Sequence, residues 1–104
     1  MKFVAVCACP AGLMHTFMAA KGLKKEAKKG RDEIAVETQS ASGIENEITP
    51  EELAAADAVI LAIDTAISGM ERFNGKPVVQ VGTSTVLRNA KSVLDQARKA
   101  AKGE

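Results

Sequence analysis

One short segment of the chain begins with a potential nucleophile, and it reads Cys9-Pro10-Ala11-Gly12-Leu13-Met14-His15-Thr16. A cysteine thiolate is a strong nucleophile that can form covalent intermediates with transferable groups. A free thiol has a pKa of about 8.5, but converging backbone N–H groups and the positive end of a helix lower a thiol pKa toward neutrality. The segment therefore indicates Cys9 as a nucleophile.

The residues that follow Cys9 are suited to binding an anion. A loop between a strand and a helix directs backbone N–H groups at one point and adds the positive end of the helix dipole. Pro10 restricts the turn, and Gly12 lets the backbone pass close to a bound anion. We therefore predict a phosphate-binding loop formed by Pro10, Ala11, Gly12, Leu13, Met14, His15 and Thr16.

Two side chains of this loop have a second interpretation. His15 can donate one pH-dependent hydrogen bond to phosphate, or it can only cap or pack against the first helical turn. The hydroxyl of Thr16 can contact the ligand, or it can bond only to the backbone of its own helix. Both residues stay candidates for the phosphate site.

The spacing of Cys9 and His15 is similar to the Cys-x5-Arg loop of cysteine-dependent phosphatases, with histidine in the arginine position. Arginine binds a phosphoryl transition state through two parallel hydrogen bonds, whereas histidine offers a single donor. No well-placed aspartate is evident as a general acid. The loop is therefore better suited to holding a phosphoryl group for a second acceptor, and a hydrolase like the low-molecular-weight phosphatases is the alternative.

A redox function is the third interpretation of the two cysteines, Cys7 and Cys9. A thioredoxin-like oxidoreductase has the motif Cys-x-x-Cys, whereas a single residue separates the cysteines here. Cys7 lies within an apolar run, where a cysteine is usually a small buried hydrophobic residue. We therefore do not expect Cys7 to take part in the chemistry.

Alternating strands and helices must position this loop. Apolar runs predict strands over residues 3–8, 34–38, 58–63 and 78–81. Helical periodicity and capping residues predict helices over residues 13–29, 50–56, 64–73 and 84–101. Cys9 then lies directly after the first strand and ahead of the first helix.

This alternation predicts the fold class α/β. We expect three layers: a four-stranded, mainly parallel sheet in the order 2-1-3-4, with helices on both faces as in Rossmann-like folds. Ligands of such folds bind at the carboxyl ends of the strands, and Cys9 follows the end of the first strand. The expected fold and the loop chemistry therefore point to the same site.

Length and charge exclude several classes of protein. The 104 residues are expected to form a single domain, residues 1–104. Nucleic acid is not an expected partner, because 14 basic and 13 acidic side chains leave a net charge of only +1 and Trp and Tyr are absent. The sequence shows no signal peptide and no apolar run of about 20 residues, which predicts a cytoplasmic protein that does not span a membrane.

Three acidic residues, Glu37, Glu45 and Glu47, are the candidates for a metal site. No histidine lies near them in the sequence, and their spacing matches no common set of metal ligands. We therefore predict that the protein binds no metal, and we expect no cofactor.

Short motifs over nearly the whole chain are similar to those of a known family. They are Ala8-Cys9-Pro10, Gly12, His15-Thr16-Phe17-Met18-Ala19-Ala20, Val36-Glu37-Thr38-Gln39, Gly43-Ile44-Glu45-Asn46, Ala55-Ala56-Asp57, Glu71-Arg72-Phe73 and Gly75-Lys76. In this order they resemble the fructose-type enzyme IIB domain of the bacterial sugar phosphotransferase system. Two positions depart from that family: Ala11 stands where it often has Thr, and Ser40 stands where Gly usually follows Glu-Thr-Gln.

The resemblance implies a function for the whole chain. It implies that Cys9 receives a phosphoryl group from a phosphohistidine of a IIA domain. Cys9 would then pass the group to fructose, or to a fructose-like sugar, held by a membrane IIC domain. The implied activity is that of a protein-phosphohistidine–sugar phosphotransferase, which acts at the inner face of the membrane when it is docked to IIC.

Overall fold

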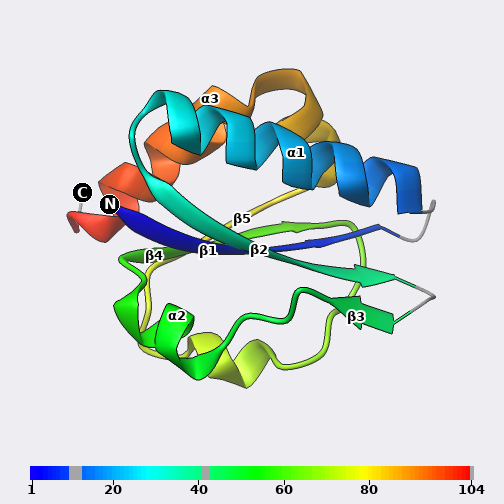
Figure 1. The fold of residues 1–104 in the computed structure, drawn as a ribbon, viewed down its shortest axis with the longest axis horizontal. Coiled ribbons are helices and arrows are strands. Elements are labelled where there is room, and N and C mark those ends of the chain that lie inside the picture. Colours follow the sequence, from blue (N-terminus) through cyan, green and yellow to red (C-terminus); the bar gives the residue numbers. More distant parts are fainter. Residues whose placement is uncertain (10–12, 41–42, 104) are drawn as a thin grey trace.

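The computed structural model describes residues 1–9, 13–40 and 43–103, and residues 13–15 by their backbone alone. Within this part of the chain, five strands form one sheet in the order β3-β2-β1-β4-β5 (Figure 1). Neighbouring strands pair in parallel except β2 and β3, which are antiparallel. The strands are β1 (Lys2–Ala8), β2 (Glu33–Ser40), β3 (Gly43–Glu45), β4 (Ala58–Ile63) and β5 (Val78–Val81).

The prediction of four strands is wrong, because the sheet has five strands in the order β3-β2-β1-β4-β5. The four predicted strands keep their predicted relative order as β2-β1-β4-β5, and the fifth strand is added at the edge beside β2. The missed strand is β3, whose residues are all exposed. It is held by backbone pairing with β2, with Thr38 opposite Glu45 and Ser40 opposite Gly43. A strand held by its main chain alone leaves no apolar pattern in the sequence, and for this reason the sequence predicts only turns there.

Helices cover both faces of the sheet, which confirms the predicted three-layer α/β architecture (Figure 1). One face carries α1 (Leu13–Lys29) and α3 (Thr83–Ala101), and the other carries α2 (Pro50–Ala55) and the 3-10 helix η1 (Met70–Phe73). The prediction of a helix over 64–73 is wrong for residues 64–69, because within this segment only the four residues of η1 are helical. Among the described residues, no helix has the length and apolar character that a membrane span requires.

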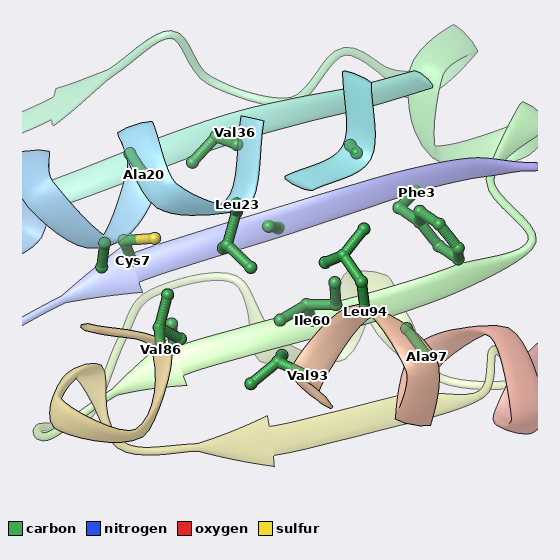
Figure 2. Packing of buried hydrophobic residues seen from close by; sticks show 14 of the residues in the cluster. Phe3, Cys7, Ala20, Leu23, Val36, Ile60, Val86, Val93, Leu94 and Ala97 are labelled. Atoms are coloured by element: carbon green, nitrogen blue, oxygen red, sulfur yellow. The ribbon is translucent and has the colours of Figure 1, made fainter. Parts of the chain in front are cut away.

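Side chains alternate along β1, and this alternation divides the core into two layers. Phe3, Ala5 and Cys7 belong to the cluster under α1 and α3, whereas Val4 and Val6 belong to the cluster on the α2 side. Figure 2 shows the first cluster, in which side chains from the sheet pack against those of α1 and α3. β1 and β4 are therefore covered on both faces, which explains their continuous apolar runs.

A break divides α3 into two helical segments at Asn89. The backbone of Asn89 is not helical, with φ −158° and ψ 74°. Its side-chain oxygen accepts a hydrogen bond from the Ser92 N–H at 3.1 Å, as the oxygen of an N-cap residue does. The second segment of α3 therefore has its own start, and Asn89 lines a surface groove together with residues of α1.

Candidate functional site

The parallel strands end at one edge of the sheet, and Cys9 lies at this edge. Ala8, the last residue of β1, is opposite Gln39 of β2 and Ile63 of β4. Cys9 follows directly, and the Asp64 N–H after β4 donates a hydrogen bond to the Ala8 carbonyl at 3.0 Å. The fold therefore places Cys9 where proteins of this class bind their ligands.

Most of the predicted phosphate-binding loop lies outside the described residues. This holds for Pro10, Ala11 and Gly12 and for the side chains of Leu13, Met14 and His15. Thr16, in the first part of α1, is fully buried, and its hydroxyl has no hydrogen-bond partner in the described structure. A buried polar group without a partner costs about 1–3 kcal/mol, so this hydroxyl calls for a partner that the described protein groups do not supply.

The two cysteines have different surroundings. Cys7 has no exposed surface, and burial raises the pKa of its thiol to about 12 although the charge of Lys24 acts to lower it. Figure 2 shows Cys7 within the core beneath α1. Cys9 exposes 8% of its surface, and neither cysteine forms a disulfide. Cys7 is therefore a neutral core thiol, whereas Cys9 lies just beyond the end of β1.

Asp64 joins the ends of β4 and β5 at the same edge. One carboxylate oxygen accepts a hydrogen bond from the Thr83 N–H at 3.1 Å, and the other accepts a short hydrogen bond from the Thr83 hydroxyl. A Cβ atom at Gly82 would lie 2.8 Å from the Asp64 carboxylate, so a larger residue there would force the carboxylate to shift. Asp64 therefore anchors the start of α3. This role was not predicted from the sequence, although Asp64 is the first acidic residue after the most apolar strand.

A buried ion pair connects β2 with η1. Glu37 is fully buried, and the guanidinium of Arg72 donates to its two carboxylate oxygens at 2.9 Å and 3.1 Å. The Ile48 N–H donates to the same carboxylate at 3.0 Å. Burial acts to raise the pKa of Glu37, but the hydrogen bonds from Arg72, Gln39 and Ile48 and the charge of Arg72 hold it below its ordinary value. Glu37 is therefore an ionised member of an ion pair.

Gln39 extends this network to the segment that follows β4. Its amide nitrogen donates to Glu37 at 2.8 Å and to the Ser68 carbonyl at 3.1 Å, and its oxygen accepts from the Ser68 N–H at 3.0 Å. Arg72 also donates to the Gly69 carbonyl at 2.8 Å. These bonds attach residues 68–69 to β2 near the edge that carries Cys9. The sequence feature that could have indicated this network is the pair of polar residues, Glu37 and Gln39, near the end of a predicted strand.

The three acidic residues considered for metal binding do not form a common site in the described structure. Glu37 is occupied by Arg72, whereas Glu45 and Glu47 are exposed. Among the described residues, no group of three or more potential metal ligands comes together.

Comparisons with known proteins identify relatives of the whole chain. A family model described as "PTS system, Lactose/Cellobiose specific IIB subunit" matches residues 4–96. The PTS system fructose-like EIIB component 2 of Escherichia coli (strain K12) is 45% identical over 95 residues, which cover 91% of this chain and 90% of the relative. The PTS system fructose-specific EIIABC component of Bacillus subtilis (strain 168) is 45% identical over 96 residues, which cover 92% of this chain but 15% of that longer protein.

A solved structure shares the fold as well as the sequence similarity. The crystal structure of a domain from the fructose-specific IIABC component of Borrelia burgdorferi matches with a TM-score of 0.87 and 44% identity, covering 97% of this chain and 93% of that one. None of these relatives is described as a phosphatase, so the hydrolase alternative is not favoured. The chain belongs to the IIB subunits of the sugar phosphotransferase system, and its role is phosphoryl transfer in sugar uptake.

Proposed function

We propose that Cys9 carries the phosphoryl group in this transfer. The observation that carries the proposal is the contrast between the two cysteines. Cys7 is a neutral thiol within the core, whereas Cys9 lies at the carboxyl edge of the sheet, shortly before the start of α1. The N-terminal end of a long helix stabilises a nearby thiolate as well as a bound phosphate.

The chemistry of this step follows from the nucleophile. The Cys9 thiolate attacks the phosphorus of a phosphohistidine, so that an S–P bond forms, the P–N bond breaks and the imidazole leaves. A sugar hydroxyl then attacks the same phosphorus, loses its proton and displaces the thiolate, which is thereby restored. The chain acts in this way as a protein-phosphohistidine–sugar phosphotransferase.

The loop after Cys9 holds the phosphoryl group between these two steps. The backbone N–H groups of residues 11–16 would donate to it, since Pro10 has no N–H. The Thr16 hydroxyl is a further donor, because it is buried and has no described protein partner. Cys9 exposes only 8% of its surface, which supports protection of the phosphocysteine from water.

The partners follow from the relatives. The Bacillus subtilis relative is described as an EIIABC component, with A and C parts in the same protein as its B part. We expect a IIA domain as the phosphoryl donor and a membrane IIC domain that holds the sugar acceptor. The chain would then act on the cytoplasmic side of the membrane. Fructose or a fructose-like sugar is the expected substrate, since the relatives at 45% identity are described by that sugar.

Transfer of labelled phosphate from phosphoenolpyruvate tests the assignment of Cys9. The general phosphotransferase proteins and the IIA region of the Bacillus subtilis relative would supply the phosphoryl group. Wild type and Cys7→Ala are expected to become labelled, whereas Cys9→Ala should not, although its circular dichroism spectrum stays native. Labelling that depends on Cys7 would contradict the proposal. Rapid release of inorganic phosphate without a sugar would instead support the hydrolase.

A further inference from the structure

A groove runs between α1 and α3 on the face that these helices cover. It has a volume of about 520 Å³ and contains both apolar and basic side chains. We call it the α1–α3 groove and define it by Met18, Lys21 and Lys25 from α1 and Leu87, Arg88 and Lys91 from α3. The chemistry of these six residues decides what the groove can bind.

The four basic residues of the groove have no acidic partner among the described residues. In the part of the chain that the structure describes, none of them forms an ion pair. The one acidic residue that lines the groove, Glu26, lies 3.5 Å from Lys29. Two arginines outside the groove, Arg72 and Arg98, are in contrast paired with buried carboxylates. The groove therefore presents an uncompensated positive charge, which is complementary to an acidic surface.

The same groove exposes large apolar side chains. Met18 is 51% exposed and Leu87 is 38% exposed, and Phe17, next to Met18, is 45% exposed. Exposed apolar side chains surrounded by charged ones are typical of surfaces that bind other proteins. Methionine adapts to surfaces of different shape, which suits a contact that forms and dissociates in every transfer cycle.

The position of the groove connects it with Cys9. α1 and α3 start after β1 and β5 at the same edge of the sheet, and they lie side by side across its face (Figure 1). Met18 and Leu87 come from the second turns of these helices. This end of the groove therefore faces the edge of the sheet that carries Cys9, and a protein seated there could reach that edge.

We propose that the α1–α3 groove is the docking surface for the phosphoryl donor, a domain whose phosphohistidine is surrounded by acidic and apolar side chains. This inference rests on the function proposed above. The acceptor fits less well, because cytoplasmic loops of membrane proteins carry an excess of Lys and Arg and would be repelled by the groove. The four basic residues would act chiefly on the rate of encounter with the donor.

Two variants with the same change of charge test this inference. The groove variant is Lys21→Glu/Lys91→Glu, with one substitution on each helix. The control is Lys28→Glu/Lys99→Glu, which reverses two exposed lysines of the same helices outside the groove. Thermal unfolding followed by circular dichroism shows whether both variants keep the fold.

The first readout is binding of the unphosphorylated IIA region of the Bacillus subtilis relative, measured by titration calorimetry. The control is expected to bind like wild type, and the groove variant should bind roughly tenfold more weakly at low salt. This difference should shrink at high salt, because the screening length falls from about 10 Å at 0.1 M to about 3 Å at 1 M. The rate of phosphoryl transfer at limiting donor concentration should follow the same order.

The two readouts distinguish the docking inference from the proposed function. Binding that depends on the groove, without phosphorylation of Cys9, would support the docking surface while the proposed function fails. Normal phosphorylation of Cys9, with equal binding and transfer for the groove variant and its control, would overturn the docking surface. Vesicles of phosphatidylglycerol test a membrane contact. If they bind through the groove while binding of the IIA region is unchanged, the groove is a lipid-binding surface and the inference is wrong.

Discussion

Substitution of Arg72 by methionine should destabilise the protein because it leaves a buried charge without its partner. Glu37 has no exposed side-chain surface, and it would lose hydrogen bonds of 2.9 Å and 3.1 Å from the guanidinium. Loss of one partner of a buried ion pair costs about 3–5 kcal/mol. We expect about 3 kcal/mol, since the Arg72 side chain is 23% exposed and Ile48 and Gln39 still donate to the carboxylate. For a domain of this size, this corresponds to a fall in Tm of about 12–24 °C.

The pH dependence of the effect has a definite sign. In wild type the pKa of Glu37 lies below its ordinary value, so the stability that ionised Glu37 contributes is present at neutral pH and lost as pH falls through the folded-state pKa. In Arg72→Met, burial raises the pKa of Glu37 with less opposition. The folded variant therefore takes up a proton at higher pH than wild type and loses less stability as pH falls. The difference in stability between wild type and variant should therefore narrow between pH 7 and pH 5.

Urea unfolding at pH 7 and pH 5 measures both effects. Glu37→Gln/Arg72→Met is the informative second variant, because it removes the buried charge together with its partner and should recover part of the lost stability. Lys2→Met is the matched control: the pair of Lys2 and Glu33 is exposed by 57% and 76% and should contribute less than about 1 kcal/mol. The reasoning is refuted if Arg72→Met costs no more than Lys2→Met, or if the double variant is no more stable than Arg72→Met.

Three other features of the structure lead to direct measurements. Cys7 should resist iodoacetamide in the native protein and react only after unfolding. Mass spectrometry of the Cys7 peptide measures this, and labelling of Cys7 in the native protein would contradict it. Thr49→Ala should lower the free energy of unfolding by about 1 kcal/mol, because it removes the N-cap of α2; urea unfolding that stays unchanged would show that this cap contributes nothing. Gly82→Ala should lower the free energy of unfolding by about 1–3 kcal/mol, since its Cβ would lie 2.8 Å from the Asp64 carboxylate. Gly22→Ala is the control: it has room for a methyl group within α1, so its melting temperature should equal or exceed that of wild type.

Features formed by residues close together in the sequence could be predicted. The helix over 13–29 has the predicted bounds, because its apolar face and the lysines of its last turn lie within one continuous segment. The helix predicted over 50–56 begins beside Thr49, whose capping box is formed with Glu52, three residues away. The central strands were equally clear, since β1 and β4 are buried on both faces and therefore apolar throughout.

Features that depend on distant residues could not be predicted. Glu37 and Arg72 are 35 positions apart, and the sequence alone does not show that the segments around them meet. A glutamate between valine and threonine has the pattern of a strand that is polar on one face. The structure buries that face under η1 and residue 48, so the glutamate becomes half of an ion pair. The helix predicted over 64–73 failed at residues 64–69 for the same reason, because Gln39 forms hydrogen bonds with both the N–H and the carbonyl of Ser68.

The difference between the two cysteines depends on where β1 ends. Residues two apart on a strand point to the same face, so a longer β1 would place Cys9 on the face of Cys7, beneath α1. β1 ends at Ala8, and proline, which follows Cys9 in the sequence, has no N–H to donate to a sheet. Strand termination therefore separates a buried, neutral thiol from one that lies at the edge of the sheet. Pro10→Val should therefore favour a longer β1. The rate of Cys9 phosphorylation should fall clearly, whereas the free energy of unfolding should change little.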